Sequence, residues 1–263
     1  MEGSSYNKKP KIELFDNCEE IKQDEKLKFQ ELVEKAPQIK EGVDFVFEQK
    51  PELADIGTPE QYSAYADTIF PESQMRDIVY HGTASKEKIE KFDFDRSNYG
   101  NAVFFTKDKK FAETYAHDEV RDGSVQVQVL DIEKPFDYSD PEKIQELCPI
   151  IKELISLSHK SPTGVNFMIN PQGMQVGDNF IVNPTLDDAV NHYVHRLKNG
   201  AWRIIETPAI IKFLSEKYDS IKVVEHGREN IAVFNQDQIH VLGSQSDIEK
   251  FKNYVALLDH NNL

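Results

Sequence analysis

After Pro71 the sequence changes from charged segments to short runs of β-branched and aromatic residues, and this change constrains the fold more than any other feature. The runs are separated by turn-forming residues or by segments with helical spacing of apolar residues, a pattern typical of an α+β domain. The expected strands span residues 77–82, 102–106, 126–130, 221–224, 231–234 and 239–242.

Helical segments lie between and around these strands. In the N-terminal part, Thr58, Pro59 and Gln61 form a helix start in which Thr58 is the N-cap and Gln61 the reciprocal partner. Ser246 is the expected cap of the last helix. The other expected helices span residues 21–40, 107–117, 144–158, 186–197 and 207–217.

These elements divide the chain into parts. We expect a helical N-terminal extension over residues 1–75, a core over 76–245 and a C-terminal helix over 246–263. A helical and loop-rich insertion, with a possible hairpin, interrupts the core at about 141–200.

Composition narrows the classes of partner. The chain has 263 residues, of which 39% are hydrophobic, so it is long enough to bury a core. No window approaches 18 uncharged apolar residues and the N-terminus is polar, which favours a cytoplasmic protein without a membrane span. The 46 acidic and 31 basic side chains give a net charge of −15, which disfavours a nucleic-acid partner.

The spacing of the cysteine and histidine residues does not indicate a metal site or a disulfide bond. Cys18 and Cys148 lie too far apart in sequence to form a metal motif or a disulfide framework, so we expect both to be reduced. His192 and His195 have a spacing that can ligate metal on a helix, but no second pair of ligands accompanies them. We expect no metal.

Three segments carry the residues that could perform chemistry. The first is Val79-Tyr80-His81-Gly82-Thr83, which ends an expected strand in a turn. The second is Val103-Phe104-Phe105-Thr106, with Phe111-Ala112-Glu113-Thr114-Tyr115-Ala116 close behind it. The third is Glu229-Asn230-Ile231-Ala232-Val233-Phe234-Asn235 in the expected hairpin.

In this order and at this spacing, the three segments resemble the split NAD⁺ pocket of the ADP-ribosyltransferases. Within that superfamily they are most similar to the diphtheria-toxin-like branch with a His-Tyr-Glu signature, and there to the transferase domains of phage and mobile-element polyvalent proteins. The resemblance covers about residues 77–243. It implies two small, mostly antiparallel sheets packed across a cleft, the split sheet core of these enzymes.

The resemblance also implies roles in binding NAD⁺. His81 would hydrogen-bond the adenosine-side ribose, the backbone of Gly82 would grip the nicotinamide amide, and Thr83 would add a polar contact. Tyr115 would stack on the nicotinamide ring, and Phe104 takes the place of the second pocket aromatic. The segment 95–101, with Tyr99, would pass over the dinucleotide, whereas Phe105 and Phe111 are expected in the core.

The third segment departs from the family pattern. Counting back from Phe234, Asn230 occupies the position that matches the catalytic glutamate, and the carboxylate of Glu229 lies one residue earlier. Because side chains alternate along a strand, Glu229 would face the other side of the sheet unless the hairpin is bulged. Glu225 on the preceding strand is a further candidate, so Glu229, Glu225 and Asn230 all stay open as the catalytic group.

The function implied by the resemblance is mono-ADP-ribosyl transfer from NAD⁺, with release of nicotinamide. We expect the acceptor to be a protein in preference to a small molecule or a nucleic acid, and a toxin or effector delivered into another cell is compatible with a small transferase. Two alternatives remain: an NAD⁺ glycohydrolase, in which water is the acceptor, and an inactive domain of the same fold that binds a protein.

Overall fold

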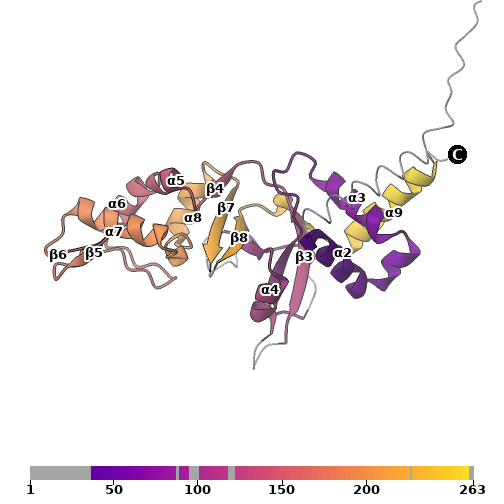
Figure 1. The fold of residues 1–263 in the computed structure, drawn as a ribbon, viewed down its shortest axis with the longest axis horizontal. Coiled ribbons are helices and arrows are strands. Elements are labelled where there is room, and N and C mark those ends of the chain that lie inside the picture. Colours follow the sequence, from indigo (N-terminus) through magenta and orange to yellow (C-terminus); the bar gives the residue numbers. More distant parts are fainter. Residues whose placement is uncertain (1–36, 87–88, 95–100, 118–121, 226, 261–263) are drawn as a thin grey trace, which may run out of the picture.

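The computed structural model describes residues 37–86, 89–94, 101–117, 122–225 and 227–260. Its sheet lies in the middle of an elongated molecule, with the helices of the insertion at one end and the terminal helices at the other (Figure 1). The strands are β1 Val79–Thr83, β2 Val103–Thr106, β3 Ser124–Leu130, β4 Pro135–Asp137, β5 Met174–Val176, β6 Asn179–Ile181, β7 Ser220–Glu225, β8 Arg228–Val233 and β9 Ile239–Val241. The helices are α2 Pro37–Gln49, α3 Pro59–Ile69, α4 Lys109–Ala116, α5 Pro141–Gln145, α6 Cys148–Ser156, α7 Leu186–Lys198, α8 Pro208–Ser215 and α9 Gln245–His260, with 3₁₀ turns η1 Pro51–Asp55, η3 Trp202–Ile204 and η4 Gln236–Gln238.

The main sheet has the strand order β4-β7-β8-β2-β1-β3-β9. Its β4 and β7 strands run parallel and all other neighbours run antiparallel. β1 and β2 meet at a single residue pair, Tyr80 opposite Thr106, whereas β7 and β8 pair over six residues. The α+β class is confirmed, and the expected split takes the form of one sheet whose two halves are joined at this β1–β2 pair.

Helices cover one face of the sheet in two groups. The insertion helices α5 to α8 pack over the β4-β7-β8 half, where Phe136, Ile221 and Ala232 are fully buried. The terminal helices α2, α3 and α9, together with α4, pack over the β1-β3 half around Tyr80 and Val127. Paired residues of neighbouring strands share a face, so the pairs Phe104–Ala232 and Tyr80–Thr106 place both helical groups on the same side.

The opposite face is covered by residues 89–94, and this changes the environment of β3. Its alternating sequence predicts a half-buried strand, but Gln126 and Gln128 are buried as well as their apolar neighbours. The Gln126 amide hydrogen-bonds the backbone N–H and C=O of Ile89, at 2.6 and 3.2 Å. The expectation of a solvent-facing side was therefore wrong, because the Gln126 amide pairs with the covering segment and the Gln128 amide donates to the backbone carbonyl oxygens of Gln126 and Val79.

Two helix starts differ in how well the sequence predicted them. Thr58 and Gln61 form the expected reciprocal capping box at the start of α3. At α9 the cap is Ser244, whose hydroxyl accepts from the Asp247 backbone N–H at 3.2 Å, so the prediction of Ser246 was wrong by half a turn. The hydroxyl of Ser244 fits the capping rule equally well, and sequence spacing did not separate the two serines.

The single helix expected over residues 144–158 is two helices. α5 ends at Gln145 and α6 begins at Cys148, followed by Pro149 in its first turn. Proline cannot donate the backbone hydrogen bond that would continue the preceding helix, but it is well suited to a first turn. The possible hairpin in the insertion is present as β5 and β6, whereas the helix expected over 21–40 lies almost entirely outside the described residues.

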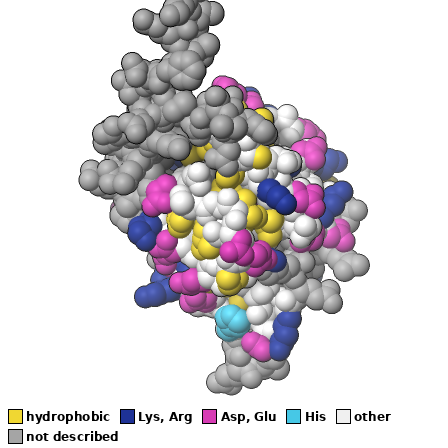
Figure 2. Space-filling model, turned by 90° about the vertical axis from the view of Figure 1, so that its right-hand side faces the viewer, with side chains coloured by type: hydrophobic (Ala, Val, Ile, Leu, Met, Phe, Trp, Pro, Cys, Tyr) yellow, Lys and Arg dark blue, Asp and Glu magenta, His cyan; other side chains and the backbone are white. Residues whose placement is uncertain are grey.

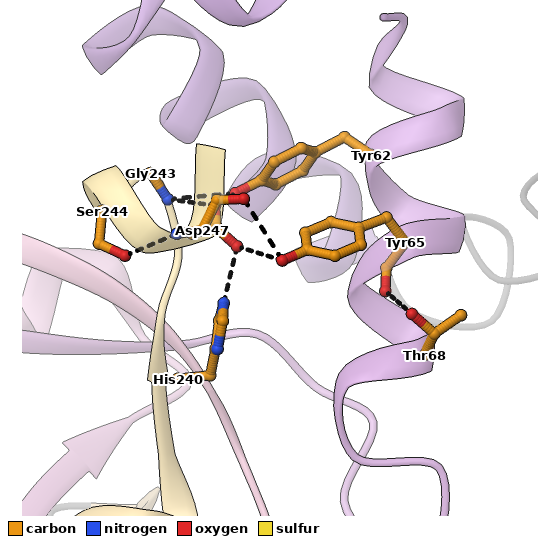
Figure 3. Close-up of polar contacts among 7 residues, drawn as sticks. All are labelled: Tyr62, Tyr65, Thr68, His240, Gly243, Ser244 and Asp247. Carbon is orange, nitrogen blue, oxygen red and sulfur yellow. Dashed lines mark hydrogen bonds and ion pairs between the residues drawn. The ribbon is translucent and has the colours of Figure 1, made fainter. Parts of the chain in front are cut away.

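A buried carboxylate joins the two terminal parts of the chain to the sheet (Figure 3). Asp247 of α9 is fully buried and accepts hydrogen bonds from the Tyr62 hydroxyl, from the Tyr65 hydroxyl at 3.0 Å and from the Gly243 N–H at 2.7 Å. His240 of β9 places Nε2 2.7 Å from the same carboxylate. These contacts connect α3, β9 and α9, and we call them the Asp247 cluster.

The surface at the end of the molecule that carries the terminal helices has both apolar and charged side chains. Figure 2 shows apolar side chains in the middle of the described surface, with charged side chains, mostly acidic, around them. Within the described residues, no helix has both the length and the apolar character that crossing a membrane requires.

Candidate active site

His81 lies at the joint between the two halves of the sheet. Its Nδ1 is 2.9 Å from the carbonyl oxygen of Phe104 on β2, and its ring packs edge-on against Phe92 with centroids 5.0 Å apart. A carbonyl can only accept, so Nδ1 carries the proton and Nε2 holds the lone pair of the neutral ring. Burial lowers the pKa of His81, and the smaller effect of the Phe104 carbonyl opposes it. The imidazole is therefore a neutral group that bridges β1 and β2.

Gly82 allows α4 to lie directly against β1. A Cβ atom at this position would be 1.9 Å from the carbonyl oxygen of Ala112 and 3.0 Å from Cβ of Tyr115. Any other residue would push the helix away from the strand. The close contact also sets Tyr115 beside the backbone of Gly82, while the Thr83 hydroxyl accepts from the Ser85 N–H at 3.2 Å in the turn that follows.

The two aromatic residues of the predicted pocket come from different elements. Tyr115 on α4 is 47% exposed and meets Phe111 edge-on, with ring centroids 5.3 Å apart. Phe104 on β2 is half-buried and packs against the core of the insertion. Phe105, on the other face of β2, is a core residue as expected. Tyr115 thus offers an accessible ring, whereas Phe104 lies at the edge of the core.

Glu225 and Asn230 face each other across the β7–β8 hairpin. The Asn230 side-chain N–H donates to Oε2 of Glu225 at 2.9 Å, and the two residues are only 5% and 9% exposed, Asn230 being the more buried. The side-chain oxygen of Asn230 has no hydrogen-bond partner among the described residues. Asn230 is paired with Thr106 of β2, two residues along from Phe104. We call the side of the sheet that carries Phe104, Glu225 and Asn230 the site face.

Glu229 lies on the opposite side of the hairpin. The register of β7 and β8 is continuous from Ser220–Val233 to Glu225–Arg228, so no bulge turns Glu229 toward Asn230. Its carboxylate instead contacts Lys107 Nζ at 2.7 Å and Lys222 Nζ at 2.8 Å. Burial alone would raise the pKa of Glu229, but the hydrogen bonds to the two lysines outweigh burial and lower it.

Arg228 connects the hairpin with α4 on the site face. Its Nε is 2.7 Å from the Asp108 carboxylate, and its guanidinium lies 5.0 Å from the centroid of the Phe111 ring. Asp108 is also the N-cap of α4 and accepts from the Phe111 N–H at 3.0 Å. Sequence reasoning missed this pair, because the N-cap of α4 was readable but its partner lies 120 residues away.

Glu206 is a second acidic residue that sequence reasoning missed. It lies in the turn between η3 and α8, where Ile204, Ile205 and Thr207 are fully buried. Burial, followed by the charge of Glu225, raises the pKa of Glu206 to about 8, and Arg203 opposes this in part. A glutamate that follows two isoleucines was the available signal in the sequence.

The remaining predicted residues are placed as follows. Tyr99 lies outside the described residues. His192 contacts the backbone carbonyl of Gln175, and His195 Nε2 is 2.9 Å from the Asn199 amide. In the described part of the chain, no group of three or more His, Cys, Asp or Glu side chains is arranged to hold a metal ion.

A sheet split beside a histidine, an aromatic pair on the next strand and helix, and an acidic hairpin that closes the sheet define the class of the ADP-ribosyltransferase fold. The family model described as "ADP-Ribosyltransferase in polyvalent proteins" matches residues 75–248, and the chain belongs to this family. The substrate of the family is NAD⁺. No curated protein and no solved structure matches the chain.

Proposed function

We propose that this protein is a mono-ADP-ribosyltransferase that moves one ADP-ribose from NAD⁺ to a protein and releases nicotinamide. The observation that carries the proposal is the buried hydrogen bond between Glu225 and Asn230 on the site face. The family carries a glutamate at the position of Asn230. In this chain the neighbouring strand supplies the carboxylate to the same place.

The chemistry of NAD⁺ cleavage explains why this arrangement suits the reaction. The bond between ribose C1′ and the nicotinamide nitrogen breaks, and both electrons leave with nicotinamide, which becomes a neutral base. Positive charge develops on the ribose, and a fixed carboxylate in a buried site stabilises it. The Asn230 N–H holds Glu225 in place, and the unpartnered oxygen of Asn230 accepts a hydrogen bond from a ribose hydroxyl.

The other site residues fit the remaining parts of NAD⁺. Tyr115 presents an exposed ring beside the backbone of Gly82, which suits stacking on nicotinamide with the amide held by the strand. His81 faces the opposite side of the sheet, where its ring packs against Phe92 and Phe105, and its Nδ1–H donates to the Phe104 carbonyl and so joins the two strands beside the site. Arg228 and Asp108 close the side of the site between the hairpin and α4.

Transfer of label from biotinylated NAD⁺ to proteins of a cell lysate tests the proposal. We expect Glu225→Gln to lower labelling about 10²- to 10³-fold, because it removes the negative charge that stabilises the transition state. Glu229→Gln is the matched variant: it lies in the same hairpin, removes the same charge and faces the other way. We expect it to label like the wild type.

Other results would contradict the proposal. Loss of labelling in Glu229→Gln with activity retained in Glu225→Gln would assign the chemistry to the other face. Release of nicotinamide without labelled protein would indicate a glycohydrolase. A folded protein that does neither would indicate a binding module, for which the Asn230 replacement is the supporting observation.

A further inference from the structure

The tip of the insertion, residues 161–185, is almost free of charge. Asp178 is the single charged side chain of this segment, whereas 29% of the whole chain is charged. The two strands of the tip, β5 and β6, lie at the end of the molecule opposite the terminal helices (Figure 1). Half of the large apolar side chains that are exposed in the described part of the chain belong to this segment: Met168, Ile169, Phe180 and Val182. Exposed apolar side chains that gather in an uncharged segment mark an interaction surface.

One edge of the β5–β6 hairpin is open. The edge of β5 lies against α7, where His192 contacts the carbonyl oxygen of Gln175. Because Gln175 directs this carbonyl away from β6, its opposite residue Phe180 directs its own N–H and C=O away from β5, as in an antiparallel pair that shares no hydrogen bonds. Among the described residues, no further strand pairs with β6. The backbone of Phe180 is therefore placed to extend the hairpin with another strand.

The side chains at this edge are apolar. The Phe180 ring lies against Gly173, where a Cβ atom would be 2.2 Å from the ring, and Phe180 is still 64% exposed. Val182, two residues further on, is 61% exposed. Single exposed apolar residues are ordinary, but proteins usually protect an open strand edge with charged residues, and β6 contains none.

Charge distinguishes the possible occupants of this edge. Anionic lipid surfaces and nucleic acids attract Lys and Arg, and residues 161–185 contain neither. Two copies of this chain each carry a net charge of −15, so they repel each other least where charge is absent. If two β6 strands pair antiparallel around Phe180, each Asp178 lies opposite Val182 of the second copy, and the two carboxylates are at opposite ends of the pair. The edge is thus complementary to itself, as a two-fold interface requires.

We propose that this protein forms a two-fold symmetric dimer in which the β6 strands of two copies pair antiparallel and join the two hairpins into one sheet. Phe180 lies on the axis, where its N–H donates to the carbonyl oxygen of Phe180 in the second copy. The dimer does not depend on the proposed function, because the site face belongs to the main sheet and not to the hairpin. β6 has 3 residues, so we expect a weak dimer with a dissociation constant of roughly 1–100 µM.

Sedimentation velocity over about 1–200 µM protein tests the proposal. We expect the weight-average mass to rise from that of one chain toward that of two. Phe180→Lys sets two like charges opposite each other on the axis, so this variant should stay a monomer. Leu257→Lys is the matched control, because Leu257 on α9 is 63% exposed and introduces the same charge at the other end of the molecule. It should dimerise like the wild type.

Disulfide cross-linking gives a second readout, which does not require the hairpin to tolerate a lysine. Opposite residues of a hydrogen-bonded antiparallel pair have Cα atoms about 5.5 Å apart, a distance that a disulfide spans. We expect mild oxidation to join two chains of Phe180→Cys on a non-reducing gel. Leu257→Cys should give no more cross-linked dimer than the wild type, whose own cysteines Cys18 and Cys148 set the background.

Three results would overturn the proposal. A wild type that stays a monomer over the whole concentration range has no such interface. A dimer that persists in Phe180→Lys, or that gives no cross-link in Phe180→Cys, uses another surface. A monomer that sediments with phosphatidylcholine vesicles, and loses this binding in Phe180→Lys, would assign the tip to lipid.

Discussion

At the scale of single residues, the site depends on a few positions where no other side chain fits. Gly82 is the sharpest case, because the α4 backbone occupies the space that a Cβ would take. His81 is another, since its imidazole bridges two strands that share only one residue pair. These residues combine a binding role implied by the family with a structural role that the packing makes visible.

We expect Gly82→Ala to destabilise the protein by about 3 kcal/mol, the upper end of the usual cost of overpacking, because the clash is with backbone. The added methyl group would lie 1.9 Å from the Ala112 carbonyl oxygen. Gly200→Ala serves as the control: its Cβ would meet nothing within 4 Å, and its φ of +81° alone should cost about 1 kcal/mol. Urea unfolding measures the change in the free energy of unfolding of both variants. Equal changes would show that α4 shifts to make room for the extra methyl group.

At the scale of elements, hydrogen bonds to buried charge connect parts that lie far apart in the sequence. The Asp247 cluster joins α3 to α9 across more than 180 residues, with Tyr62 and Tyr65 as donors. Arg228 and Asp108 do the same for the hairpin and α4. A carboxylate as buried as Asp247 is tolerated because each of these donors compensates part of its lost hydration.

We expect Tyr62→Phe to cost about 1.5–3 kcal/mol, the range for a hydrogen bond to a charged group. Tyr138→Phe is the matched control, because Tyr138 is also a buried tyrosine but donates to the neutral backbone carbonyl of Leu197. Tyr138→Phe should lower the free energy of unfolding by about 0.5–1.5 kcal/mol. Chemical denaturation provides both values. If Tyr138→Phe lowered the free energy of unfolding as much as Tyr62→Phe does, the charge of Asp247 would not strengthen the hydrogen bonds of the Asp247 cluster.

At the scale of the whole molecule, the family segment depends on helices that lie outside it. The match covers residues 75–248, but the core over the β1-β3 half also contains side chains from α2, η1, α3 and α9. The most buried of these are Val43, Val46, Leu53, Tyr62, Tyr65 and Phe251. The predicted boundaries of the extension, the insertion and the terminal helix stay predictions, as do a cytoplasmic location and delivery as a toxin or effector.

A fragment of residues 75–248 should therefore fail to unfold cooperatively. Each large apolar side chain that it loses contributes about 1.5–3 kcal/mol on burial, and several such losses exceed the stability of a typical domain, about 5–15 kcal/mol. Near-UV circular dichroism during heating, with the full chain beside the fragment, measures this. A fragment that melts within a few degrees of the full chain would contradict the expectation.

The sequence by itself was sufficient for what depends on local physics. Strand runs, the capping box at Thr58 and Gln61, and the hairpin after residue 220 follow from periodicity and from backbone preferences that act over a few residues. The family, its fold class and its NAD⁺ chemistry were predicted from three short segments, and the family match over residues 75–248 confirms the family. Alternation also predicted that Glu229 and Asn230 face opposite sides.

Only the tertiary structure decided which distant groups meet. It pairs Glu225 with Asn230 through the strand register, joins Arg228 of the hairpin to Asp108 at the start of α4, and buries Gln126 and Gln128 on the face covered by residues 89–94. The physical reason is that burial and electrostatic contact depend on distances in space, which packing sets between residues far apart in the chain. Local preferences act along the chain and carry no information on those distances.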